Sequence, residues 1–130
     1  MQAIKAARTE STPEIIFNPV HNTLFIAGEC YPENPNLFFQ PILGTLQAHF
    51  GNKLPAKFYT RIRLSYVNSA STKSMRQLFM VLNEAAHAGA AVDIDWEFDE
   101  EDDAIQDLGE DLMHGLGVTW LNFNEVPFVV

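Results

Sequence analysis

Cysteine is nearly absent from this chain. Its 130 residues include one, Cys30, so no intramolecular disulfide can form and a cage of cysteine ligands for a metal is excluded. Glu29 and Glu33 stand close to this thiol in the sequence, and negative neighbours disfavour a reactive thiolate. Cys30 is therefore predicted to be a buried or half-buried side chain, in a protein of a reducing, cytoplasmic compartment.

Positive charge and long apolar runs are also scarce. Eight Lys and Arg stand against seventeen Asp and Glu, which gives a net charge of −9 and argues against nucleic acid and anionic membranes as partners. No stretch approaches the roughly 18 apolar residues of a membrane span, and residues 1–8 lack the apolar run of a signal peptide. We expect neither nucleic-acid binding nor membrane insertion.

Motifs of catalysis and metal binding are missing as well. The chain has no G-x-S-x-G elbow, no phosphate-binding P-loop and no G-x-G-x-x-G, and its four histidines do not have metal-type spacing. Some acidic residues have the spacing of a calcium loop, but Ala104 stands where that loop needs glycine. These acids are Asp99, Glu101, Asp103, Asp107 and Glu110. We predict no enzymatic activity, no cofactor and no metal.

Apolar residues are plentiful. They make up 47% of the chain and include ten phenylalanines, enough for one folded domain over residues 1–130. Short strands are predicted at 15–17 and 23–29, and the turn formers between them indicate a hairpin. Asn34 and Pro35 are typical of a helix start. That helix is predicted to stop at Gly51-Asn52, with Pro41 as a kink or a later start.

The second half of the chain alternates between strand and helix patterns. A strand is predicted at 57–67, and an amphipathic helix follows it and closes at Gly89. Residues 92–98 alternate strictly between apolar and acidic side chains, the pattern of a half-buried strand. A helix at 102–113 and a strand at 119–126 complete the order β-β-α-β-α-β-α-β. This order predicts an α/β fold with a mainly parallel mixed sheet and an antiparallel N-terminal hairpin.

The junction between the 57–67 strand and the following helix carries the strongest functional signal. Ligands of α/β sheets bind beyond the carboxyl ends of strands, and a helix N-terminus favours a phosphate through its free N–H groups. Phosphorylation of Ser69 or Ser71 would bring about −1.5 to −2 charge there. The alternative is that these serines only cap the helix.

Three segments together resemble one known family. Residues 11–15 (STPEI), 28–34 (GECYPEN) and 66–75 (YVNSASTKSM) are similar, in order and spacing, to the SiaC family of bacterial regulatory phosphoproteins. The resemblance implies a fold like the STAS domain of anti-sigma-factor antagonists. It also implies a protein that, when unphosphorylated, activates a diguanylate cyclase and so raises cyclic di-GMP and favours biofilm formation.

The resemblance implies partners and site residues too. A dedicated Ser/Thr kinase would phosphorylate Ser69, with Ser71 as the rival, and a PP2C-type phosphatase would remove the phosphate. The partner surface would comprise Tyr31, Pro32, Glu33, Asn34, Tyr66, Asn68, Ser71, Thr72 and Lys73. For residues 31–34, a plain turn at a helix start is an equal alternative. The alternatives for function are an anti-sigma-factor antagonist and a small phosphate-ligand binder.

Overall fold

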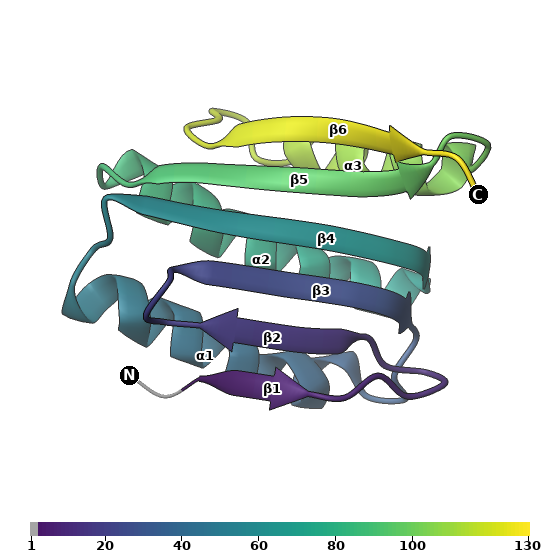
Figure 1. Ribbon diagram of the computed structural model, residues 1–130, viewed down its shortest axis with the longest axis horizontal. Coiled ribbons are helices and arrows are strands. Elements are labelled where there is room, and N and C mark those ends of the chain that lie inside the picture. The colour runs from purple at the N-terminus through teal and green to yellow at the C-terminus, as the bar shows by residue number, and fades with distance from the viewer. Residues whose placement is uncertain (1–2) are drawn as a thin grey trace.

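The computed structural model describes residues 3–130, which form one mixed sheet with helices packed on a single face (Figure 1). The strands are β1 (Ile4–Ala6), β2 (Glu14–Asn18), β3 (Thr23–Cys30), β4 (Lys57–Val67), β5 (Ala91–Asp99) and β6 (Asn122–Phe128). The helices are α1 (Pro35–Asn52), α2 (Ser69–His87) and α3 (Asp103–His114).

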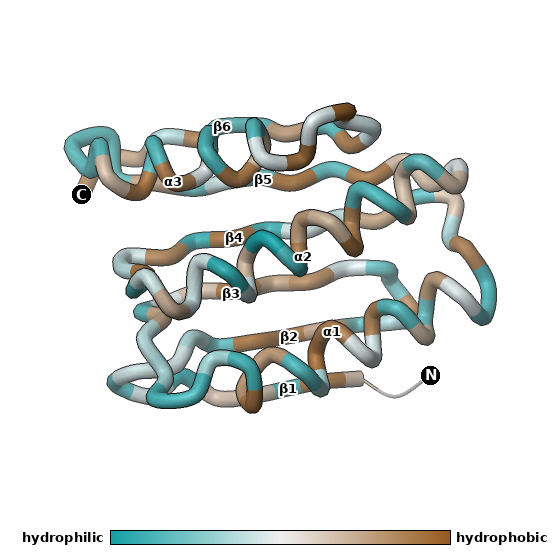
Figure 2. Tube along the Cα trace, turned by 180° about the vertical axis from the view of Figure 1, so that it is seen from behind, coloured by the Kyte–Doolittle hydropathy of each residue, from teal (hydrophilic) through white to brown (hydrophobic). Residues whose placement is uncertain are grey.

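The strands lie in the sheet in the same order as in the chain, from β1 to β6. The pairs β1–β2 and β2–β3 are antiparallel, whereas β3, β4, β5 and β6 run parallel. Each helix thus connects neighbouring parallel strands in one direction, and right-handed crossovers of this kind place all helices on the same face. Figure 2 shows the three helices on that face. The predicted α/β fold and its N-terminal hairpin are confirmed.

The sequence pattern did not predict β1. This strand has three residues and pairs with β2 through Lys5 and Ile16. A three-residue strand carries too few positions for an alternating pattern, so its register on β2 alone defines it. At the other edge, β6 begins and ends later than the predicted 119–126.

Each helix begins at a polar cap. The side chains of Asn34, Asn68 and Asp102 accept hydrogen bonds of 3.0–3.1 Å from the backbone N–H three residues later, which satisfies donors that the helix leaves free. Pro35 occupies the first turn of α1, as predicted. The helix continues through Pro41, which is exposed, and ends at Asn52.

The core lies between the sheet and the three helices. Side chains of β2 and β5 alternate between buried and half-buried positions, as expected where one face of a sheet is covered. The largest side chains with less than 2% exposure are Trp96, Phe17, Phe39, Phe58 and Phe79. Trp96 donates a 2.9 Å hydrogen bond from its indole to the carbonyl of Ile105 in α3, which fixes that helix to β5.

One buried amide holds the segment before β6. Asn83 of α2 donates from Nδ2 to the carbonyl of Val118 at 2.9 Å. Its Oδ1 accepts from the backbone N–H groups of Trp120 and Leu121, at 2.7 and 3.2 Å. A segment without regular structure thereby has its backbone groups satisfied at three points.

Candidate functional site

The predicted site lies where β3 and β4 end side by side. Cys30 and Val67 are register partners at these two ends, and the backbone N–H of Asn68 donates to the carbonyl of Cys30 at 3.1 Å. Because α1 and α2 begin just beyond the same ends, two helix N-termini meet at this edge of the sheet (Figure 1). Ligands of α/β sheets commonly bind beyond the carboxyl ends of the strands, which is where this junction lies.

All three sequence segments of the resemblance meet here. The rings of Tyr31 and Tyr66 pack edge to face, with centroids 5.8 Å apart and planes at 69°. The backbone N–H of Tyr31 donates to the carbonyl of Ser11 at 2.8 Å. Burial, then the charges of Glu29 and Glu10, raises the pKa of Tyr31, so its phenol remains a neutral hydrogen-bond donor at this edge.

Ser69 is the first residue of α2 and is exposed. The alternative in which a serine caps this helix is wrong, because the cap is Asn68. The Oδ1 atom of Asn68 occupies the N–H of Ser71. The Ser69 side chain is therefore not needed as the cap and lies at the positive end of a 19-residue helix.

Ser71 occupies a different environment. Its side chain is 0% exposed, its Oγ has no hydrogen-bond partner of full geometry within residues 3–130, and it lies next to the thiol of Cys30. Burial raises the pKa of the Cys30 thiol, and the Ser71 hydroxyl lowers it by a smaller amount. A kinase cannot reach Ser71 in this fold without opening the helix. The helical spacing of Ser71 to Met75 and Leu78 on the buried face was the available signal.

The residues predicted to bind a partner lie at the same edge, with unequal exposure. Exposed are Glu33, Asn34, Tyr66 and Lys73, half-buried are Tyr31, Asn68 and Thr72, and buried are Pro32 and Ser71. Pro32 and Ser71 can therefore shape this surface but cannot make most of its contacts.

A groove of about 390 Å³ runs beside the junction, and α3 forms its second wall. The end of β4 and Thr72 line one side, while Asp107, Leu108 and Asp111 line the other. Sequence reasoning missed this wall, because only the crossover of α3 brings it to β4. The acids with calcium-loop spacing lie mostly along α3, a helix, rather than in a loop.

A second, shallower hollow lies at the start of α1. Pro35, Leu37 and Phe38 line it together with Glu33 and Asn34, and Leu37 is 73% exposed. An exposed leucine next to a half-buried phenylalanine offers apolar area to a partner. This apolar contribution was not among the predicted site residues, since both side chains also fit the helical pattern of a core.

The part of the chain that the structure describes contains neither a metal site of clustered ligands nor a membrane-spanning helix. No group of three or more His, Cys, Asp or Glu in residues 3–130 could hold a metal ion. None of the helices formed by these residues has both the length and the apolar character to cross a bilayer.

Comparisons with known proteins point to one family. A family model described as "SiaC family regulatory phosphoprotein" matches residues 6–127. The crystal structure of apo-SiaC from Pseudomonas aeruginosa has a TM-score of 0.87 and 25% identity, covering 97% of this chain and 99% of that one. A chain in the crystal structure of the diguanylate cyclase SiaD in complex with its activator SiaC, from the same organism, has a TM-score of 0.83 and 23% identity, covering 94% of this chain and 98% of that one.

One further relative is similar in sequence. An uncharacterized protein of Pseudomonas aeruginosa strain UCBPP-PA14 is 28% identical over 104 residues, which are 79% of this chain and 81% of the relative.

Proposed function

The chain belongs to the SiaC family of regulatory phosphoproteins, and on that premise we propose that it binds and activates a diguanylate cyclase when Ser69 is unphosphorylated. A dedicated Ser/Thr kinase adds the phosphate, a PP2C-type phosphatase removes it, and the cycle runs in the cytoplasm. The resulting rise in cyclic di-GMP promotes biofilm formation. A structurally similar SiaC has been crystallised in complex with the diguanylate cyclase SiaD, and this supports a diguanylate cyclase as the partner.

One observation carries the choice of Ser69. Of the two candidate hydroxyls, that of Ser69 lies on an exposed first helical residue, whereas that of Ser71 is fully buried. A kinase must surround its target hydroxyl, so exposure selects Ser69. Because Ser69 directly follows Asn68 at the start of α2, a phosphate there would adjoin the proposed partner surface.

Phosphorylation would change this surface mainly through charge. The groove beside the junction is already acidic, with Asp107 and Asp111 on its α3 wall. A dianion of about −1.5 to −2 at Ser69 adds to this negative charge and must be desolvated when the partner docks. It opposes docking where the partner surface that meets Ser69 is acidic or apolar. A near-complete switch needs about 5.5 kcal/mol of preference between the two states.

The test combines phosphosite mapping with cyclase activation. We expect mass spectrometry of the protein from its native cells to find one phosphate, on Ser69. Ser69→Ala should keep cyclase activation and lose the phosphate, whereas Ser69→Glu should lose activation. Ser71→Ala is the matched control. It removes a buried hydroxyl whose only neighbour of note among residues 3–130 is the Cys30 thiol, and it should leave phosphorylation of Ser69 and cyclase activation unchanged.

Other outcomes would contradict the proposal. Phosphate on Ser71 alone would transfer the switch to a residue that this fold buries. An unmodified protein that leaves cyclase activity unchanged but captures an anti-sigma factor would instead assign it to the anti-sigma-factor antagonists.

A further inference from the structure

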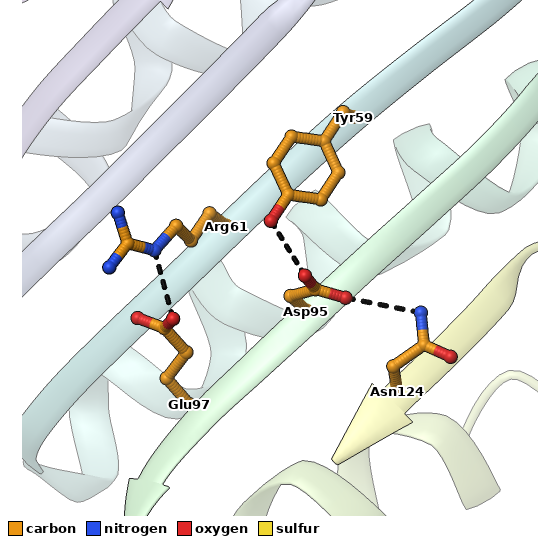
Figure 3. Close-up of polar contacts among 5 residues, drawn as sticks. All are labelled: Tyr59, Arg61, Asp95, Glu97 and Asn124. Carbon is orange, nitrogen blue, oxygen red and sulfur yellow. Dashed lines mark hydrogen bonds and ion pairs between the residues drawn. The ribbon is translucent and has the colours of Figure 1, made fainter. Parts of the chain in front are cut away.

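The sheet face opposite the helices is uncovered over residues 3–130. Figure 1 shows all three helices behind the sheet, and Figure 3 shows polar side chains standing on the open face in front of it. Four of the six strands are parallel. All-parallel sheets nearly always have both faces covered, so the open face of the parallel part of this mixed sheet, β3 to β6, favours a cover from outside the chain.

Charge is segregated on this face. Strand β4 contributes Arg61 and Arg63, with Lys57 at its start, and the charged side chains that the neighbouring β5 places on this face are all acids. These acids are Asp93, Asp95, Glu97 and Asp99. Arg61 is in register with Asp95, and Arg63, two residues further along the strand, is level with Glu97. A row of positive charge therefore lies beside a row of negative charge, with their members at the same heights.

We propose that this face is the interface of a homodimer, with a second copy of the chain packed face to face on it. The two-fold axis lies parallel to the strands, between β4 and β5. Rotation about this axis places β4 over β5 of the second copy without changing the height along the strand. Arg61 then faces Asp95 of the second copy and Arg63 faces its Glu97, each contact occurring twice. Such self-complementarity is what an isologous interface requires.

The side chains of this face are already ordered within one copy (Figure 3). The Tyr59 hydroxyl donates to Asp95 at 2.6 Å, and the Nδ2 atom of Asn124 donates to the same carboxylate at 3.1 Å. Arg61 pairs with Glu97 at 2.9 Å. Groups held in place by such contacts lose little side-chain entropy on association.

Arg63 is a cation of this face whose hydrogen-bond donors are largely unused. Its guanidinium lies 3.8 Å from the centroid of the Phe128 ring and makes no ion pair among residues 3–130. Stacking on an aromatic ring leaves the edge of a guanidinium free for a carboxylate. Glu97 of the second copy, whose side chain is 16% exposed, would fill that position.

The size of the face indicates a weak dimer. With the axis between β4 and β5, only strands β3 to β6 overlap with those of the second copy. Four strands spaced about 4.8 Å apart and about 20 Å long give roughly 400 Å² on each copy. Standard interfaces bury about 800 Å² per partner, so we expect a transient dimer that forms only at high protein concentration. Half-buried Phe25 and Val126 add apolar area beside the charged rows. The Ser69 junction lies at the strand ends and stays accessible in this arrangement.

The experiment measures mass in solution by light scattering and sedimentation over a concentration series. We expect the full chain to approach twice its 14.6 kDa as concentration rises. Both Arg63→Glu and Glu97→Arg should weaken self-association at least about 10-fold, since each places like charges opposite one another. Mixing the two variants should restore dimers, because both cross-contacts then pair opposite charges. Arg76→Glu, exposed on α2, is the matched control and should dimerise normally.

Restoration by mixing separates a lost interface from a lost fold, because two misfolded chains would not restore one another. A chain that stays monomeric up to millimolar concentration would overturn the proposal. So would dimers that both reversals leave intact, or well-folded variants that fail to pair when mixed. None of these readouts involves a cyclase or a kinase, so the result is independent of the proposed function.

Discussion

Gly109 is the position at which one added methyl group should cost the most stability. It lies in the middle of α3 and is buried. A Cβ built there would stand 2.6 Å from Nε1 of Trp96 and 2.8 Å from Cδ1 and Cε2. The same indole donates its N–H to Ile105, one turn earlier in α3. The indole thus lies directly across the helix, and only glycine leaves room for it.

The cost of Gly109→Ala follows from three opposing contributions. Overpacking a filled core costs about 1–3 kcal/mol. If α3 moves away from Trp96, a buried N–H loses its acceptor at about 1–3 kcal/mol. The higher helix propensity of alanine stabilises the folded state by about 1 kcal/mol. We expect Gly109→Ala to lower the free energy of unfolding by about 3 kcal/mol.

Gly44→Ala is the matched control for this substitution. Gly44 also lies inside a helix, α1, but is exposed, and a Cβ there meets nothing within 4 Å. It should raise the free energy of unfolding by up to about 1 kcal/mol. Urea denaturation followed by circular dichroism should therefore shift the two midpoints in opposite directions. A Gly109→Ala protein as stable as the parent, or stabilised like Gly44→Ala, would refute the packing described for Trp96.

Three further substitutions or titrations test other parts of the structure. Asn83→Ala should lower the free energy of unfolding by about 2–4 kcal/mol, because buried backbone groups lose their partners. Asn83→Asp keeps the acceptor oxygen, so its free energy of unfolding should fall by less in the same urea titration. Burial, assisted by the hydrogen bond to Asp95, raises the pKa of Tyr59 to about 12. The stability this provides is present below pH 10 and lost as pH rises towards 12; Asp95→Asn should lower that pKa in an ultraviolet titration. Burial lowers the pKa of His49 below 6.5, so stability should fall as pH drops below 6.5, and an NMR titration in which His49 keeps an ordinary pKa would contradict this.

Sequence patterns predicted most elements because their signals are local. The strict alternation of residues 92–98 identified β5, and turn formers identified the β2–β3 hairpin. The helix predicted at 102–113 is α3 within one residue at each end. What the pattern did not reveal was the closeness of Gly109 to Trp96. That contact depends on how a helix lies on a strand, and spacing along the chain does not contain this information.

The candidate site was predicted in part for the same reason. The junction after β4 follows from sequence, since a strand and a helix start can both be recognised there. The alternative of a serine cap placed the cap one or more residues too late, although Asn68 is an equally good cap by residue type. The α3 wall of the groove could not be predicted, because only the packing of α3 brings Asp107 and Asp111 next to Thr72.

The strands lie in the sheet in the order in which the ribosome makes them. Each strand from β2 onwards pairs with the strand made just before it, so no strand must insert between two others already in place. Assembly can therefore follow the ribosome, with every new helix and strand adding to one growing edge. A nascent chain that pauses after β5 exposes an unpaired edge instead of a gap in the sheet, and this open edge is the part most exposed to wrong pairing until β6 arrives.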